Sequence, residues 1–363
     1  MLSKSRSGAV FGESNIGGQQ VKIALTFILC ISFFFISFRQ WTPIDRRIPW
    51  VASENLDNIA DIYNETLGFE KIFVIGLEER DDKRDAMAVA SSLTGFTFDW
   101  SEGVKGDDVA DNALPPSLNR EKAGTNAIGC WRAHLDVARA IVSGKISTGL
   151  IMEDDADWDV RLKSQLVDFA WGSRYILNET SSNTSVSSSP YGDGWDMLWV
   201  GHCSAQTKDD DKRRYLIPND PTVPGPDRRM NFGPIPDMKS WENDTRIIFE
   251  SGGGVCLYGY ALSFAGAQKL LHYVPLSKDE FPIDIAFKRM CKDPARDFRC
   301  IGVFPQIIDS HKFAGPSSRD SDIDNHTGTT RDRGYTFNIR KSTRLNIEKL
   351  LHGQDELIEE LNM

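Results

Sequence analysis

The sequence predicts an α/β protein whose sheet is mostly parallel, preceded by one membrane-spanning helix. Apolar runs without polar alternation, such as 72–77 and 149–152, are typical of strands that are buried on both faces. Between such runs lie stretches with apolar residues at helical spacing, as in 125–142. Strands that alternate with helices indicate a Rossmann-type sheet. A third observation, the uncharged segment 23–38, predicts the membrane helix.

The composition is that of an acidic globular protein. The 363 residues include 42 Lys and Arg against 52 Asp and Glu, which gives a formal charge of −10. This acidic excess argues against nucleic-acid binding, which requires a basic surface for the phosphates. The length suffices for one large domain or two small ones, and such a chain buries enough surface to fold without disulfides.

The segment 23–38 is expected to be an uncleaved signal anchor behind a short cytoplasmic tail, 1–22. Its 16 uncharged residues fall just below the usual spanning length of about 17 to 25. Lys22 and Arg39 can extend it by reaching toward the two interfaces. A cleaved signal peptide is the main alternative, but no small-residue cleavage site follows Arg39. A buried core helix is a weaker alternative, because the segment has no polar face.

Five N-x-S/T sequons orient this anchor, since the positive charges on its two sides are balanced. They all follow the segment and stand at Asn64, Asn178, Asn183, Asn243 and Asn325. We therefore expect a single-pass type II protein of the endoplasmic reticulum or Golgi membrane, with its main domain in the lumen. Disulfides are permitted in that compartment. Five cysteines follow the anchor, so at least one stays free, and loop length alone favours the pair Cys291–Cys300.

The remaining elements are expected in chain order after a polar stem at 39–68. The predicted strands are 71–77, 96–100, 149–152 and 195–200, and the predicted helices are 81–93, 125–142 and 161–171. A Ser-rich loop at 181–190 and a long insertion loop at 203–249, rich in Pro and charges, interrupt the alternation. The tail from 311 to 363 is polar, and we expect it to be loose until a closing amphipathic helix at 344–361.

An acidic triplet, Glu153, Asp154 and Asp155, directly follows the apolar strand at 149–152. Ligands of open parallel sheets bind at the carboxyl ends of strands, so the triplet lies at the appropriate edge. Adjacent carboxylates repel one another unless a cation neutralises them, and hard oxygen ligands suit Mg²⁺ or Mn²⁺. Strand alternation would direct Glu153 and Asp155 to one side and Asp154 to the other. The alternative is a solvated acidic loop, which the strand-end position disfavours.

Two further motifs are candidates for site residues. Cys130 and His134 are one helical turn apart and can share a face, but as a metal pair or a nucleophilic pair they lack partners in the sequence. Asp284, in Pro-Ile-Asp, stands at the start of an expected helix. It can be a catalytic carboxylate or only the helix N-cap, and the sequence leaves both interpretations open.

Together these motifs resemble glycosyltransferase family 25, the lipopolysaccharide-type and collagen-type sugar transferases. The resemblance extends from about residue 71 to residue 305, with the motifs in the family's order. The matching segments are 72–77, Arg80 to Arg84, 103–106, 129–134, 153–155, Tyr260, 266–270 and 282–284. The chain departs from the family pattern at Gly76, where Asn is usual, at Ala133, where Ser is usual, and in the long insertion at 203–249.

The resemblance implies a GT-A-like transferase domain at 69–310 that binds a nucleotide sugar, UDP-galactose or UDP-glucose, with a divalent metal, Mn²⁺ or Mg²⁺. It assigns Glu153 and Asp155 to the metal. The donor-binding residues that it implies are Arg84, Gly106, His134 and Asp154.

The family transfers its sugar with inversion, which requires a base, and Asp284 is the candidate. The acceptor would be a glycan or a glycoprotein. A catalytically degenerate glycan-binding member and a structural lumenal membrane protein remain the alternatives.

Overall fold

The computed structural model describes residues 58–116, 118–179, 187–231, 242–276, 281–323 and 328–359. The predicted anchor at 23–38, the tail before it, and the sequons at Asn183 and Asn325 lie outside these ranges. Within them, no helix combines the length and the apolar character that crossing a membrane requires.

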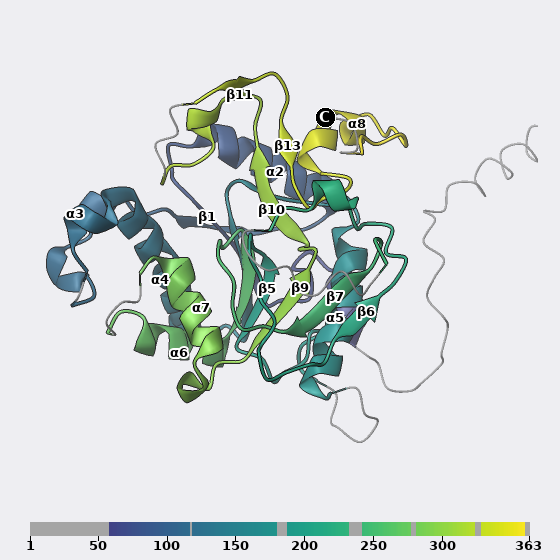
Figure 1. Ribbon diagram of the computed structural model, residues 1–363. Coiled ribbons are helices and arrows are strands. Elements are labelled where there is room, and N and C mark those ends of the chain that lie inside the picture. Colours follow the sequence, from purple (N-terminus) through teal and green to yellow (C-terminus); the bar gives the residue numbers. More distant parts are fainter. Residues whose placement is uncertain are drawn as a thin grey trace, which may run out of the picture. The chain divides into compact units, whose positions relative to one another are not determined.

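A central sheet organises the described unit in the strand order β2-β1-β3-β8-β5-β9-β7-β6 (Figure 1). The strands of this path are β1 (Lys71–Gly76), β2 (Asp99–Glu102), β3 (Thr148–Glu153), β5 (Met197–Gly201), β6 (Tyr215–Ile217), β7 (Arg246–Glu250), β8 (Gly259–Ser263) and β9 (Cys300–Phe304). β1 is parallel to both β2 and β3, and β5 is parallel to β9. β8 is antiparallel to both of its neighbours, β3 and β5. The result is a mixed α/β fold with a mainly parallel central sheet, as expected for the Rossmann-like type.

Helices cover both faces of this sheet, which explains the continuous apolar runs of the inner strands. Along β1, the side chains of Ile72 and Val74 pack into one buried cluster, and those of Phe73 and Ile75 pack into the other. The first cluster includes residues of α2 (Asp81–Thr94) and α5 (Leu162–Leu177). The second includes residues of α4 (Thr125–Gly144), α6 (Phe264–Tyr273) and α7 (Ile283–Lys292), which lie together in Figure 1.

Several expectations about the less regular parts of the chain are wrong. The stretch 203–249 is not one loop, because it contributes β6 and β7 to the sheet. Buried Arg246 anchors β7 through an ion pair with Asp220 at 2.7 Å. The stem ends before residue 68, since the side chains of Ile62 and Leu67 are fully buried in the core.

The C-terminal tail is also packed and not loose. Its strand β10 (Ile308–Lys312) pairs with β5, with β4 (Ala156–Trp158) and with β13 (Tyr335–Thr336), and its strand β11 (Gly315–Pro316) pairs with β12 (Thr330–Arg331). Fully buried Asp157 of β4 accepts hydrogen bonds from the hydroxyls of Thr336 and Ser342 and from the backbone N–H of Arg344. The expected helix at 344–361 is limited to a 3₁₀ turn and α8 (Ile347–Leu351).

Two disulfides connect parts of the fold. Cys291 at the end of α7 pairs with Cys300 of β9, which confirms the pair that loop length favoured. Cys203 pairs with Cys256 and so joins the chain after β5 to the segment before β8. Of the cysteines in the described ranges, Cys130 is free, in agreement with the odd number after the anchor.

Candidate active site

A cleft of about 380 Å³ opens where β1 and β3 end. In the parallel pair of these strands Ile75 lies opposite Glu153, so the chain segments that leave both strands meet at one edge. The cleft is lined by residues from 75–83, 103–107, 125–134, 153–155 and 320–323. All three carboxylates of the acidic triplet are among them, which places the triplet at the sheet edge that the sequence predicted.

The three carboxylates are held by three different elements. Glu153 lies toward His134 of α4, with 3.5 Å between Oε1 and Nε2. Asp154 accepts a hydrogen bond from Lys83 of α2 at 3.0 Å. Since α2 and α4 cover opposite faces of the sheet, these two side chains diverge as the strand alternation predicted. Asp155 lies toward β10, where the Ser310 hydroxyl donates to its Oδ2 at 2.7 Å.

Asp155 has the properties expected of a cation ligand. Burial opposes its ionisation, but Lys312, Lys83, the Ser310 hydrogen bond and Arg344 outweigh burial, and the pKa lies below its ordinary value. The carboxylate is therefore charged at neutral pH. Its other oxygen, Oδ1, is buried and makes no hydrogen bond to any residue that the structure describes. A buried charged oxygen that has no partner among the described residues fits a hard divalent cation.

Asp154 differs from its neighbour in its electrostatics. Burial raises its pKa to about 6, because the attraction of Lys83 only partly compensates for the lost hydration. Its side chain also explains the unusual glycine on β1. A Cβ at Gly76 would lie 2.9 Å from both Cβ and Oδ2 of Asp154. Glycine at this position therefore allows the Asp154 carboxylate to pack against the end of β1.

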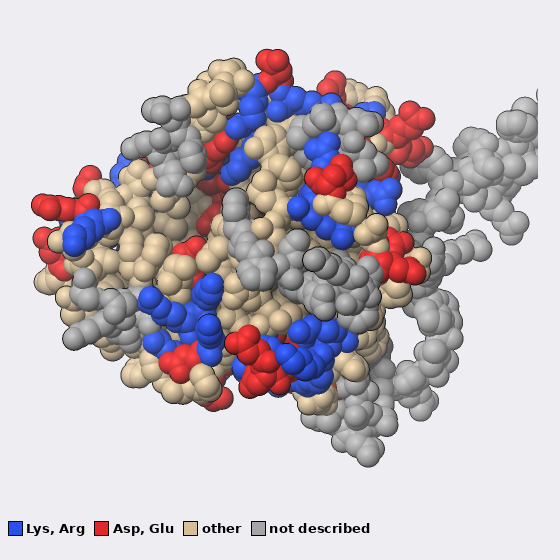
Figure 2. Space-filling model, in the orientation of Figure 1, with Lys and Arg blue, Asp and Glu red and all other residues tan. Residues whose placement is uncertain are grey.

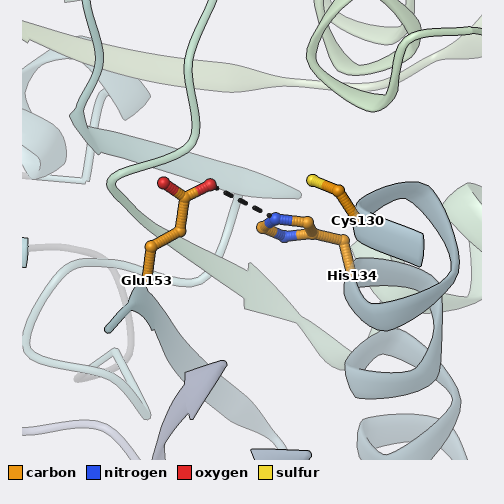
Figure 3. A group of neighbouring side chains, drawn as sticks. All are labelled: Cys130, His134 and Glu153. Carbon is orange, nitrogen blue, oxygen red and sulfur yellow. Dashed lines mark ion pairs between the residues drawn. The ribbon is translucent and has the colours of Figure 1, made fainter. Parts of the chain in front are cut away.

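Cys130, His134 and Glu153 form a second group in the cleft (Figure 3). Their ligand atoms lie within 4.8 Å of one another, and the expected shared face of Cys130 and His134 is confirmed. The Tyr260 hydroxyl is hydrogen-bonded to His134 Nδ1 at 2.9 Å and so orients Nε2 toward Glu153. Burial, reinforced by the charges of Glu153 and Asp284, raises the pKa of the Cys130 thiol. The thiol is therefore protonated at neutral pH, which disfavours a nucleophilic role.

Gly106 lies in the cleft wall, where the loop after β2 packs closely against α4. A Cβ at Gly106 would lie 1.8 Å from the backbone oxygen of Thr125, and one at Gly129 would lie 2.1 Å from that of Val104. Only glycines allow the loop after β2 to approach the first turns of α4 this closely. The backbone of this loop and that of α4 therefore lie in close contact at this wall of the cleft.

Comparison with known proteins supports the family suggested by the motifs. No family model matches the chain. The chain is 22% identical over 331 residues to procollagen galactosyltransferase 2 of Homo sapiens. This match covers 83% of the chain and 45% of that protein. The chain is 23% identical over 283 residues to procollagen galactosyltransferase 1 of Danio rerio, covering 71% of this chain and 39% of the relative. The resemblance to glycosyltransferase family 25 is confirmed.

The match to these relatives covers only part of their length. The chain spans less than half the length of the curated relatives that it matches. One of them, from Bos taurus, is named probable inactive glycosyltransferase 25 family member 3 and is 21% identical over 290 residues, 74% of this chain and 41% of that protein.

The family's arginine-bearing helix does not bring Arg84 into the cleft. Its guanidinium pairs with Glu102 at 3.1 Å and lies 4.2 Å from the centre of the Trp100 ring, outside the residues that line the cleft. The cation that reaches the cleft from this helix is Lys83. The sequence contains no signal that distinguishes these two neighbours, because the orientation of the helix decides which side chain is buried.

Asp284 belongs to the family's Pro-x-Asp motif but is not the N-cap of α7, which is Pro282. Its Oδ1 accepts the backbone N–H of Ile285 at 2.7 Å, and its Oδ2 accepts that of Cys256 at 3.2 Å. It is not among the residues that line the cleft. However, its charge and that of Glu153 both act on the Cys130 thiol, so it faces the same region of the molecule. Its role as a base stays a prediction.

Proposed function

We propose that this chain is a hexosyltransferase with a GT-A-like fold, which moves galactose or glucose from a UDP-sugar to a hydroxyl of a glycan or glycoprotein with inversion. The observation that carries the proposal is the acidic triplet at the end of β3. Its Asp155 lines the cleft and has one buried, charged oxygen without a partner among the described residues. The names of the relatives, which are procollagen galactosyltransferases, support hexose transfer and a glycoprotein acceptor.

The residues present fit a divalent cation, Mn²⁺ or Mg²⁺. Asp155 and Glu153 would hold it, and when bound it would supply positive charge for the departing diphosphate. His134 supports this arrangement from α4, since Tyr260 fixes the orientation of its ring beside Glu153. Cys130 offers a soft ligand close to Glu153, but its protonated thiol makes it a poor partner for either of these hard ions.

Asp284 is the proposed base for the acceptor hydroxyl. Inversion requires a proton acceptor on the face of the sugar opposite the leaving nucleotide. Asp284 approaches the region from α7, whereas Glu153 ends β3 and Asp155 follows that strand. The backbone N–H groups of Ile285 and Cys256 hold both of its oxygens and so fix the direction in which it can accept a proton.

The membrane topology belongs to the same proposal. The segment 23–38 would anchor the chain in the endoplasmic reticulum or Golgi membrane, with the transferase domain in the lumen. Three of the five sequon asparagines lie in the described ranges, and these three, Asn64, Asn178 and Asn243, are all exposed. Exposed acceptor side chains are what attachment of a glycan requires.

The decisive experiment is a donor screen with the purified full chain. UDP-galactose and UDP-glucose are offered with Mn²⁺ and a collagen-derived glycoprotein acceptor, and the release of UDP is measured. We expect release with one of the two donors and its loss when EDTA removes the metal. A folded chain that releases UDP from neither donor would contradict the proposal.

A second candidate function is glycan binding without transfer. The relative named as probably inactive and the departures at Gly76 and Ala133 favour it. However, Gly76 is explained by the packing of Asp154, so this departure does not by itself indicate a lost site. A chain that binds glycans on an array but releases no UDP in the donor screen would establish this function.

A further inference from the structure

Lys83 is a buried cation in the cleft that the assignments above leave without a function. Its side chain is only 4% exposed, and its ammonium lies 3.0 Å from Asp154 Oδ1 and 3.0 Å from Asp322 Oδ2. Burial lowers its pKa, but the charges of Asp155, Asp154 and Asp322 outweigh this, and the net shift is upward. Lys83 is therefore a permanent positive charge at the end of β1 near the acidic triplet.

Arg80 lies one turn earlier and shares the same carboxylate. Its Nη1 lies 2.5 Å from Asp322 Oδ2, while its Nε and Nη2 are bound to Asp82 at 2.9 Å and 3.0 Å. Arg80 is not among the residues that line the cleft, so its link to the cleft is Asp322, which does line it. Asp322 thus receives two cations from α2. Figure 2 shows this pairing of charges more widely, with basic and acidic side chains side by side over the C-terminal strands.

Asp322 reaches α2 from a distant part of the sequence. It belongs to residues 320–323, which follow β11 and form one wall of the cleft. Of the two carboxylates that contact Lys83, Asp322 is the more exposed, at 32% against 10% for Asp154. It can therefore leave for water at low cost, whereas Asp154 would lose a buried partner.

We propose that Lys83 is the main contact of a subsite for the phosphate groups of the nucleotide donor, with Nη1 of Arg80 as a second contact, and that Asp322 occupies this subsite in the free protein. The inference rests on the proposed function. It adds donor-binding residues that the family motifs did not assign. The Lys83 ammonium and Nη1 of Arg80, which bind this one carboxylate, also suit phosphate oxygens, because both donate charge-assisted hydrogen bonds. Phosphate binding thus exchanges one anion for another, and Lys83 remains paired with Asp154.

The surrounding contacts permit this exchange with a local movement. Arg319 is held to Asp82 at 3.0 Å, and Asp320 is paired with Arg331. Neither of these two ion pairs includes Asp322. Residues 319 and 320 can therefore stay attached to α2 and to β12 when the Asp322 carboxylate moves away. The donor would therefore compete with one side chain and would not have to open the whole segment.

The test measures the dissociation constants of UDP, uridine and inorganic pyrophosphate for the full chain by calorimetry. Asp322→Asn removes the competing charge. We expect UDP and pyrophosphate to bind at least about fivefold more tightly, the lower end of typical coupling between two ligands, while uridine binding is unchanged. Lys83→Met should weaken the binding of both phosphate ligands. The matched control is Asp99→Asn, which removes the same charge from an exposed pair with Lys71 outside the cleft.

The outcomes separate this inference from the proposed function. If UDP binds and sugar is transferred but Asp322→Asn leaves the UDP dissociation constant unchanged, the subsite is wrong and the transferase stands. An equal gain for uridine also overturns it, because uridine carries no phosphate. If pyrophosphate binding tightens while UDP does not bind, the anion subsite stands and the proposed donor fails. If Lys83→Met does not fold, the dissociation constants measured with Asp322→Asn still test the subsite.

Discussion

At the scale of single residues, the candidate site depends on how each member of one acidic triplet is paired. Asp154 has a lysine, Glu153 faces a histidine, and Asp155 keeps one oxygen without a partner in the described ranges. The sequence predicted that the triplet is a site and that it lies at the carboxyl edge of the sheet, because the triplet directly follows an apolar strand. It could not predict Lys83, since Lys83 and Arg84 are adjacent cations and only the tertiary packing of α2 distinguishes them.

Asp155→Asn should reduce transfer by at least about 100-fold while the fold is retained. The substitution removes the charge that would hold the cation and keeps the volume, and an amide oxygen can still accept from Ser310. Initial rates with a UDP-sugar and calorimetric Mn²⁺ binding check this, with Asp210→Asn on an exposed loop as the control. Near-normal activity and metal affinity in the Asp155 variant would show that the cation is held elsewhere.

Asp284→Asn should lower turnover by about 10² to 10⁴, the usual cost of losing a general base, with little change in UDP-sugar affinity. An asparagine can accept only one of the two backbone N–H groups that Asp284 holds, so we also expect a lower melting temperature. Turnover, UDP-sugar affinity and melting are measured together. A variant that melts lower but transfers at nearly the normal rate would make Asp284 an anchor for the Cys256 segment.

At the scale of elements, the sequence predicted the long periodic segments and missed the short strands. β1, β3, α2 and α4 were expected near their observed bounds, because each carries a continuous apolar run or apolar residues at helical spacing, whereas α5 extends six residues beyond the expected 161–171. β10, by contrast, owes its position to strand partners that are distant in sequence. Such contacts leave no local pattern. The tail therefore looked loose although it completes the sheet.

The buried carboxyl of Asp309 on β10 should make stability depend on pH. Burial raises its pKa to about 7, even though Asn338, Ser310 and Gln306 donate hydrogen bonds to it. The folded pKa of Asp309 is above the ordinary value, so the protonated carboxyl favours the folded state. This contribution to the free energy of unfolding is full at low pH and is lost as the pH rises through about 7. Denaturant unfolding between pH 5 and pH 8 should show decreasing stability, and Asp309→Asn should flatten this slope. An equal slope in both proteins would refute the assignment.

At the scale of the whole chain, the lumenal position of the domain stays a prediction, and the exposed side chains of Asn64, Asn178 and Asn243 and the two disulfides are the features that a test of it would use. Oxidising compartments are where such disulfides persist. The position of the chain in a membrane depends on residues 23–38, which lie outside the described ranges. The composition and the sequons therefore remain the basis of that prediction.

Treatment with a glycosidase that removes N-linked glycans should increase the gel mobility of the chain made in a eukaryotic host. The reason is that Asn64, Asn178 and Asn243 are accessible on the folded surface. Replacing all five sequon asparagines by glutamine should abolish the shift. An unchanged mobility, together with digestion of the domain by protease added on the cytosolic side, would reverse the topology.

Because residues 320–323 form one wall of the cleft and come late in the sequence, the cleft is incomplete while the chain is being synthesised. A ribosome completes the triplet and Lys83 long before it reaches Asp322. During that interval Lys83 and Arg80 have no carboxylate from the tail, and Asp157 lacks the hydrogen bonds of Thr336, Ser342 and Arg344. The unfinished chain would thus expose its anion subsite without competition, and a nucleotide present at that stage could act as a template for the site before the last strands close it.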